Sequence, residues 1–253
     1  MTGRLIVNAD DWGRDKNTTD RMLDCLARRS VCSVSAMVFM ADSERAAQLA
    51  REHGIDLGLH LNFSLPYSSP ACPANLLEQQ RKLATYLTRH PMARVVFHPG
   101  LAKVFDYVVK AQLEEFSRLH GTMPQRIDGH HHLHLCANVL FGNLLPPGTI
   151  VRRNFSFQAG EKSLANRLYR KMVDRRIAKR HRIVDYLFSL QPLEPARLER
   201  IRSLSRQSVV EVETHPVNAD EYRFLMGEEV IRWTEDCPIA PCFAAPAVQT
   251  PAV

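Results

Sequence analysis

Strand-like and helix-like segments alternate along most of this chain, and the alternation limits its fold more than any other feature of the sequence. Short apolar or β-branched runs are followed by longer segments with the apolar spacing of a helix. This pattern is typical of a mainly parallel sheet. The predicted strands are residues 5–8, 32–38, 55–61, 126–129, 149–152, 183–187 and 209–213. The predicted helices are residues 18–29, 43–53, 76–90, 102–119, 137–144, 164–180 and 195–205.

The length of the chain limits how many domains these segments can build. A chain of 253 residues that is 45% hydrophobic can bury one substantial core. We therefore expect an α/β fold with one domain over residues 1–253, at the size of a single (β/α) barrel like the TIM barrel. The proline-containing tail from about residue 238 is expected to be frayed.

Two features indicate the cellular compartment. The apolar stretch at residues 5–7 is too short for a signal-peptide core or a membrane span. The six cysteines are scattered and form no Cys-x-x-Cys pair, which favours reduced thiols. We therefore expect a cytoplasmic protein with no membrane span.

The net charge of +6 comes mainly from one predicted helix rather than from the whole chain. Apolar residues recur there at helical spacing, so an amphipathic helix with a solvated basic face is the simpler interpretation. A surface that binds a polyanion is the alternative, and nucleic acid is not the expected partner. The basic residues are Arg167, Arg170, Lys171, Arg175, Arg176, Lys179, Arg180 and Arg182.

Polar clusters follow four of the predicted strands. In a (β/α) barrel the loops after the strands build the active site, so these clusters are expected to converge. The first, at residues 8–13, contains Asp10 and Asp11, of which one can bind a metal while the other faces an activated water. Alone, the pair is equally consistent with a solvated turn in which Asp11 caps the next helix.

The strongest cluster is the run Asp-Gly-His-His-His-Leu-His at residues 128–134. Crowded imidazoles each need a partner, and a metal ion provides one directly. Period-two alternation is expected to place His130, His132 and His134 on one face and His131 on the other.

The two remaining clusters are weaker signals. At residues 58–62, His60 and Asn62 alternate with leucines and should share one face. At residues 211–216, a proline follows His215 and holds this histidine in an extended conformation at the strand end. Considered alone, the first is more typical of a core histidine and the second of a strand-terminating turn.

Two histidines and one carboxylate with open positions can bind a divalent cation. Zn, Mn, Fe and Co suit such ligands, and Mg suits them less naturally because of the nitrogen donors. A nearby carboxylate and histidine would supply the base and the acid of a hydrolytic reaction.

These four clusters, in this order and spacing, resemble the signature motifs of the YdjC-like carbohydrate deacetylases. The resemblance extends over residues 4–216 and implies a distorted (β/α) barrel, one divalent metal ion and removal of an N-acetyl group from a sugar. By family resemblance the metal is Mg, whereas the ligand set also suits Zn, Mn or Co.

The resemblance also implies roles for individual residues. Asp10 becomes the general base and His215 the acid that protonates the leaving amine. The expected metal ligands are Asp11, His60 and His130. The residues expected on the substrate side are Arg152, Trp12, Asn62, His132 and His134.

The residues on the substrate side have individual expectations. Trp12 stands where phenylalanine is common and is expected to stack on a sugar ring. Arg152 and Arg153 are adjacent, so the register of the family arginine stays open. His132 and His134 are expected to lie among the metal ligands or just behind them, where hydrogen bonds to the ligands orient them. The loops at residues 64–74 and 154–160 follow strand ends and are candidate substrate loops.

Two other functions remain open at this stage. A metal-dependent phosphoesterase or amidohydrolase would also use histidines at strand ends, although its His-x-His pair usually lies on the first strand. A non-catalytic polyanion-binding protein would use the basic helix and show salt-dependent binding. The sugar, the native metal and the oligomeric state, a homodimer included, are not determined by the sequence.

Overall fold

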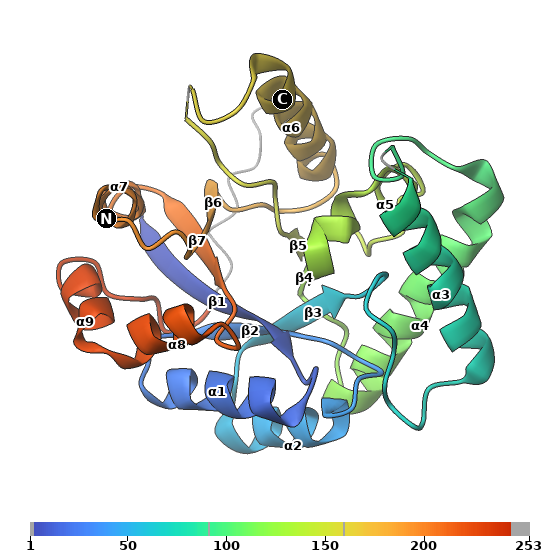
Figure 1. The fold of residues 1–253 in the computed structure, drawn as a ribbon, viewed down its shortest axis with the longest axis horizontal. Coiled ribbons are helices and arrows are strands. Elements are labelled where there is room, and N and C mark those ends of the chain that lie inside the picture. The colour runs from blue at the N-terminus through green and yellow to red at the C-terminus, as the bar shows by residue number, and fades with distance from the viewer. Residues whose placement is uncertain (1–2, 91, 159, 244–253) are drawn as a thin grey trace.

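The computed structural model describes residues 3–243 apart from residues 91 and 159, and its centre is one seven-stranded parallel sheet (Figure 1). The strand order is β5-β4-β3-β2-β1-β7-β6, so the first strand lies in the middle. The strands are β1 (Arg4–Trp12), β2 (Ser33–Ala36), β3 (Leu57–Leu61), β4 (Arg126–Gly129), β5 (Ile150–Val151), β6 (Tyr186–Ser189) and β7 (Val209–Thr214).

Helices join consecutive strands and surround the sheet. In Figure 1, α1 and α2 lie below the sheet, α3 and α4 to its right, and α7 to α9 to its left. The helices are α1 (Lys16–Ala27), α2 (Ser43–His53), α3 (Ala74–Arg89), α4 (Ala102–His120), α5 (Ala137–Phe141), α6 (Leu164–Ala178), α7 (Pro195–Ser205), α8 (Ala219–Met226) and α9 (Glu228–Thr234), with the short 3-10 helices η1 (Pro99–Leu101) and η2 (His130–Leu135).

The sheet is curled into a half-barrel, and its two edge strands are linked by neighbouring segments. The backbone N–H of Val151 in β5 donates to the carbonyl of Arg182, just before β6, at 2.9 Å. Ser156, in the loop after β5, donates its backbone N–H to the carbonyl of Leu187 in β6, also at 2.9 Å. The expected distorted (β/α) barrel is confirmed in this incompletely closed form.

The core sits between the sheet and the surrounding helices. Every residue of β1 from Leu5 to Trp12 is buried, as its central position in the sheet requires. Local signals then fix where helices begin and end. The Asp15 carboxylate caps α1 by accepting from the backbone N–H of Thr18, and Gly54 ends α2 in the left-handed conformation that glycine adopts without strain.

All seven predicted strands and all seven predicted helices are present, with ends that shift by a few residues. Helices α8 and α9 were not predicted, although Asn218 caps α8 and acidic residues occupy its first turn. The frayed tail expected from residue 238 is wrong for residues 238–243, because Ile239 bridges to Leu5 and Phe243 is buried. Residues 244–253 lie outside the described residues. None of the described helices combines the length and apolarity needed to cross a membrane.

Candidate active site

A bulge in β1 brings two adjacent carboxylates to the same place. The pairing with β2 shifts between Asp10 and Trp12, so Asp11 is the extra residue, and its φ of 76° lies in the left-handed region. Regular alternation would have turned the two side chains to opposite faces. Instead, both are buried and both approach the ring of His60. A non-glycine residue held at such a φ is strained, and strain of this kind is concentrated at functional sites.

His60, on β3, lies among three carboxylates that fix its ring. Its Nδ1 lies 2.7 Å from Oδ1 of Asp128, its register partner on β4, and donates to this oxygen. Its Nε2 lies 3.3 Å from Oδ1 of Asp11. Burial alone would lower the pKa of His60, but the negative charges of Asp10 and Asp128 outweigh it and hold the pKa well above the usual value. The pocket therefore favours a positive charge at this position.

The set formed by Asp11, His60 and His130 fits a metal ion. Their candidate ligand atoms all lie within 4.8 Å of one another. The Nε2 of His60 is buried and has no hydrogen-bond partner among the described residues, which leaves its lone pair for a cation. Burial would raise the pKa of Asp11, but the hydrogen bond from His130 and the close ring of His60 hold it well below the usual range. An ionised carboxylate and two imidazoles are the donors that borderline divalent metals accept.

The histidine run departs from the alternation expected of it. Strand β4 ends at Gly129, and the run forms the turn η2, in which His131 and His132 have φ angles of 55° and 56°. The prediction that His130, His132 and His134 share one face is therefore wrong. His131 instead packs against His130, with ring centroids 4.1 Å apart.

The last two histidines of the run make separate contacts. Nε2 of His132 lies 3.1 Å from the carboxylate of Glu213, and its ring packs on Phe155 at 4.5 Å. His134 is fully buried, and its Nε2 donates to the carbonyl of Arg152 at 2.9 Å. Burial, with the nearby His132, lowers the pKa of His134 to about 3, so this ring is neutral. His134 therefore positions the Arg152 backbone and does not reach a substrate.

Arg152, immediately after β5, ties four buried carboxylates together. Its guanidinium contacts both oxygens of Asp10, at 2.5 and 2.8 Å, and also Asp128 at 2.9 Å. It further contacts Glu211 at 2.7 Å and Glu213 at 3.2 Å. The residue is 2% exposed, so the guanidinium orients the acidic floor of the site and is not open to a substrate.

The neighbouring arginine resolves the register that the sequence left open. Arg153 points away from this floor and pairs with Asp174 of α6 at 2.7 Å. The arginine of the site is therefore Arg152.

His215 follows β7, and its ring lies close to the carboxylates of Asp10 and Glu213. Candidate ligand atoms of Asp10, Glu213 and His215 lie within 4.8 Å of one another. The backbone N–H of His215 donates to the carboxylate of Glu221 at 2.7 Å, which anchors this histidine to α8. The structure therefore brings together all five side chains expected to bind the metal and to transfer protons.

Two residues assigned to the substrate side lie elsewhere. Trp12 is fully buried, and its indole N–H donates to the carbonyl of Ala46 at 3.1 Å, so no ring face is open to a sugar. Asn62 is also fully buried, and its side chain binds the backbone of Ser64 and Leu65. It shapes the loop after β3, whose Ser64 hydroxyl lies 3.2 Å from Nδ1 of His131.

The functional residues that the sequence did not assign are the acidic and polar groups around Arg152. Asp128 was seen as part of a motif, but its contact with His60 was not predicted. Glu211 and Glu213 alternate on β7 and could have been found from that spacing, since alternate residues share a face. The side-chain amide of Asn8 donates a hydrogen bond to Oδ1 of Asp10 at 2.8 Å.

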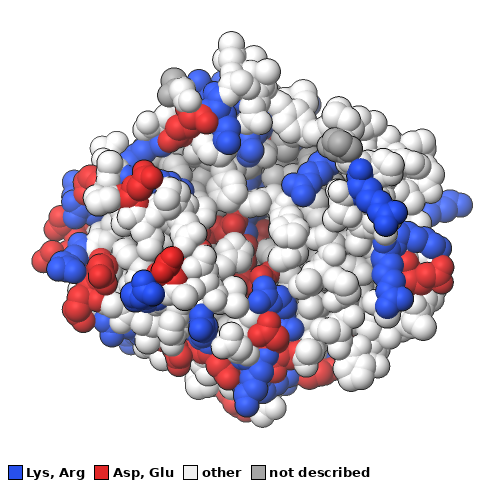
Figure 2. Space-filling view, in the orientation of Figure 1, with Lys and Arg blue, Asp and Glu red and all other residues white. Residues whose placement is uncertain are grey.

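Two cavities lie on the side of β6 and β7, and the smaller one reaches the histidine turn. Figure 2 shows a hollow near the middle of this face, with acidic side chains inside it. A cavity of about 420 Å³ is lined by Phe155, Phe157 and Phe188, together with Lys162 and Arg200. Phe155 links it to His132, which confirms that the loop after β5 borders the site.

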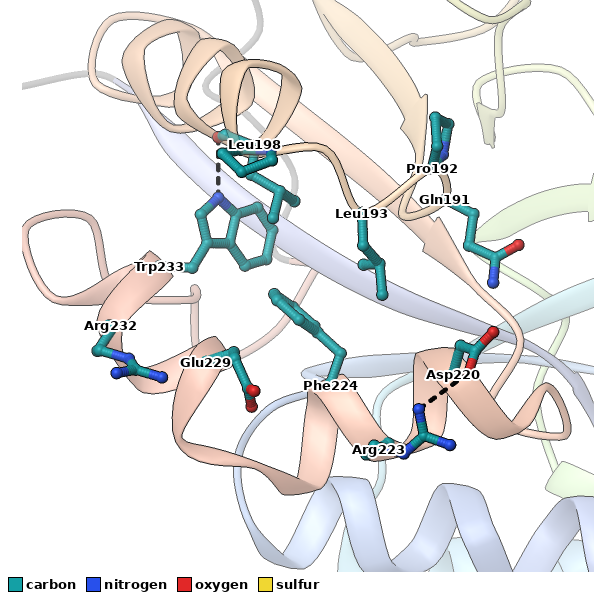
Figure 3. A pocket seen from close by; sticks show the side chains of 11 residues that line it. Gln191, Pro192, Leu193, Leu198, Asp220, Arg223, Phe224, Glu229, Arg232 and Trp233 are labelled. Carbon is teal, nitrogen blue, oxygen red and sulfur yellow. Dashed lines mark hydrogen bonds and ion pairs between the residues drawn. The ribbon is translucent and has the colours of Figure 1, made fainter.

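A larger cavity, of about 660 Å³, lies between α7, α8 and α9, and its walls include Leu193, Phe224 and Trp233 (Figure 3). It shares Gln191 and Pro192 with the smaller cavity, so the two are contiguous. The Trp233 indole N–H is satisfied by the carbonyl of Leu198 at 2.9 Å. The floor of this cavity therefore offers mainly apolar contact.

The buried carboxyl of Glu211 gives a testable pH dependence. Burial raises its pKa to about 6, although Arg152 opposes the shift, from an unfolded value near 4.5. A raised folded pKa contributes stability below the unfolded pKa, and this contribution is lost as the pH rises through 6. The variant Glu211→Gln has no ionisable group at this position, so its stability does not fall in this way. Its stability relative to the wild type should therefore improve by about 2 kcal/mol between pH 4.5 and pH 7.5, as measured by urea unfolding. Parallel pH profiles would contradict the ionisation of Glu211.

Two histidines and an aspartate, beside a second aspartate and a third histidine, are the groups that metal-assisted hydrolysis requires. A family model described as YdjC-like protein matches residues 4–236, and the chain belongs to this family. The predicted family membership is thus confirmed.

Known relatives are similar over part of their length. The carbohydrate deacetylase of Danio rerio is 30% identical over 140 residues, which are 54% of this chain and 44% of the relative. The chitooligosaccharide deacetylase of Proteus mirabilis is 33% identical over 135 residues, 53% of this chain and 51% of the relative. The match therefore spans about half the length of these relatives.

A similar fold is found in a crystal structure from Enterococcus faecalis that is named for cellobiose-phosphate cleavage. It has a TM-score of 0.65 and 19% identity, and the match covers 95% of this chain and 97% of that one. This likeness concerns the fold alone.

Proposed function

We propose that this protein is a metal-dependent carbohydrate deacetylase, which hydrolyses the N-acetyl group of an amino sugar to acetate and a free amine. The observation that carries the proposal is the grouping of Asp11, His60 and His130, in which the buried Nε2 of His60 has no hydrogen-bond partner among the described residues. The deacetylase names of the relatives support the reaction class.

The residues have distinct tasks in this proposal. Asp11, His60 and His130 would hold a divalent cation, which would polarise the amide carbonyl and lower the pKa of the attacking water. Asp10 accepts the proton of this water, and His215 donates a proton to the departing amine nitrogen. The metal is Mg, Zn, Mn or Co, and the refilling experiment described below distinguishes them.

Other residues position these groups. Asp128 fixes the ring of His60 through Nδ1, and such outer contacts orient a ligand and increase its basicity. Arg152 holds both oxygens of Asp10, so the base is already oriented before the substrate binds.

The sugar is proposed to lie toward the loop after β5. Phe155 and Phe157 offer aromatic faces at the cavity of about 420 Å³, and sugar rings pack well on such faces. We place the reaction in the cytoplasm, because all six cysteines are free thiols. We also propose that residues 1–253 form one domain.

The test combines metal removal with a ligand variant. Chelator-treated protein should release no acetate from N-acetylated chitooligosaccharides, and refilling with Mg, Mn, Co or Zn should restore release. His60→Ala should bind less than a tenth of the wild-type metal at equal free metal, because one of three ligands is lost. Metal content is measured by mass spectrometry and acetate by an enzymatic assay.

The exposed histidine at the end of α3 supplies the matched control. His90→Ala should keep both metal and activity, because His90 lies outside the site. Acetate release that persists in metal-free protein would contradict the metal's role. Release of phosphate from phosphoesters without any release of acetate would favour the alternative hydrolase class instead.

A further inference from the structure

Helix α6 exposes an apolar stripe that nothing in the site explains. Leu164, Leu168 and Met172 are 69%, 58% and 57% exposed. They follow one another at intervals of four residues, so they form a single line along the helix. The opposite side carries the buried residues Val173 and Ile177, which attach the helix to the protein. In Figure 1, α6 stands at the top of the molecule.

Cations surround this stripe. Residues 162–182 contain nine Lys or Arg and one acid, Asp174, which is buried and paired with Arg153. Lys171 and Arg175 are exposed beside Met172, and neither forms an ion pair with any described residue. The exposed face of α6 is therefore apolar and positively charged at once.

A second exposed apolar group continues from α6. Arg176 of α6 donates to the carbonyl of Leu140 and lies over the ring of Phe141, which is 55% exposed. The adjoining loop, residues 92–98, is bound to α5 through hydrogen bonds at 2.9 and 3.0 Å. This loop exposes Val96 and Phe97 by 50% and 39%.

We propose that α6 and the loop of residues 92–98 form a docking surface for an anionic lipid bilayer. Helices that lie in a bilayer interface combine an apolar line with flanking Lys and Arg, because the acyl boundary accepts the first and anionic headgroups the second. A nucleic acid would leave the aliphatic stripe in water. A second copy of this chain would bring two cationic faces together, which is unfavourable.

The test is vesicle binding, which requires no turnover and so is independent of the proposed reaction. The wild type should co-sediment with vesicles of phosphatidylcholine mixed with phosphatidylglycerol and not with phosphatidylcholine alone. The triple variant Leu164→Ser, Leu168→Ser, Met172→Ser should bind at least about tenfold more weakly, because the buried apolar area is lost. Lys171→Glu with Arg175→Glu should weaken binding and reduce its dependence on salt.

Ile231→Ser provides the matched control, since Ile231 is 51% exposed on the distant helix α9. It should bind vesicles like the wild type. Circular dichroism should show that all variants keep their helix content. The proposal is overturned if the wild type does not bind anionic vesicles, or if Ile231→Ser loses as much binding as the triple variant. It is also overturned if the wild type binds RNA instead of vesicles. A wild-type dimer that becomes monomeric in the triple variant, with no vesicle binding, would overturn it as well.

Discussion

Replacing Arg152 with methionine is expected to lower the free energy of unfolding by about 3–5 kcal/mol at pH 8, the cost of leaving buried charges without their partner. Arg152 is 2% exposed and contacts Asp10, Asp128, Glu211 and Glu213. Methionine fills similar space without the positive charge. Urea unfolding measures the loss.

The pH dependence of this loss distinguishes electrostatics from packing. Arg152 lowers the pKa of Asp128 against the effect of burial, and it acts on Glu213 in the same direction together with His132. Without Arg152 these folded pKa values rise. Carboxyls with raised pKa values stabilise the protein at low pH, and this contribution is lost as the pH increases. The defect should therefore be smaller at about pH 5 than at pH 8.

Arg153→Met is the matched control on the adjacent residue. Arg153 is partly exposed and has one carboxylate partner, Asp174, which keeps two hydrogen bonds from Asn154, so its loss should cost less than that of Arg152, about 1–2 kcal/mol. A defect in Arg152→Met that is equal at both pH values, or equal to that of Arg153→Met, would show that charge neutralisation is not the role of Arg152.

The sequence predicted the fold because its central strands, such as β1 and β7, are buried on both faces. β-branched and apolar residues dominate runs such as residues 5–8 and 209–213, which favours a buried parallel sheet. The ends of helices differ from the prediction by a few residues, since caps such as Asp15 depend on local hydrogen bonds. Helices α8 and α9 were missed because they are short, at eight and seven residues, and follow a motif that ends in a proline.

The candidate site was predicted in its residues but not in its geometry. Residue types at strand ends identified Asp11, His60 and His130, because parallel strands end at one edge of the sheet. The left-handed turn at His131 and the bulge at Asp11 depend on contacts across strands, which periodicity does not contain. The same limit explains why the prediction for Trp12 was wrong: its ring is buried against α2 and does not face a sugar.

Asp10→Asn is expected to reduce kcat for acetate release by about 10²- to 10⁴-fold, the usual contribution of a general base, while the bound metal remains. The amide has almost the same size as the carboxylate but cannot accept the proton of the attacking water. KM should change little, because Asp10 is 2% exposed and is held by Arg152 and Asn8. Single-turnover acetate release and metal analysis of the same sample check both parts.

Glu211→Gln is the matched control for Asp10→Asn. It also replaces a carboxylate that pairs with Arg152, but it leaves the neighbours of the metal-binding group unchanged. If disturbing Arg152 were the cause of lost activity, the two variants would lose it equally. If proton transfer is the cause, Glu211→Gln keeps most of its activity and Asp10→Asn does not. Full activity in Asp10→Asn would instead direct attention to Glu213, which lies beside His215 and is the other carboxylate able to serve as the base.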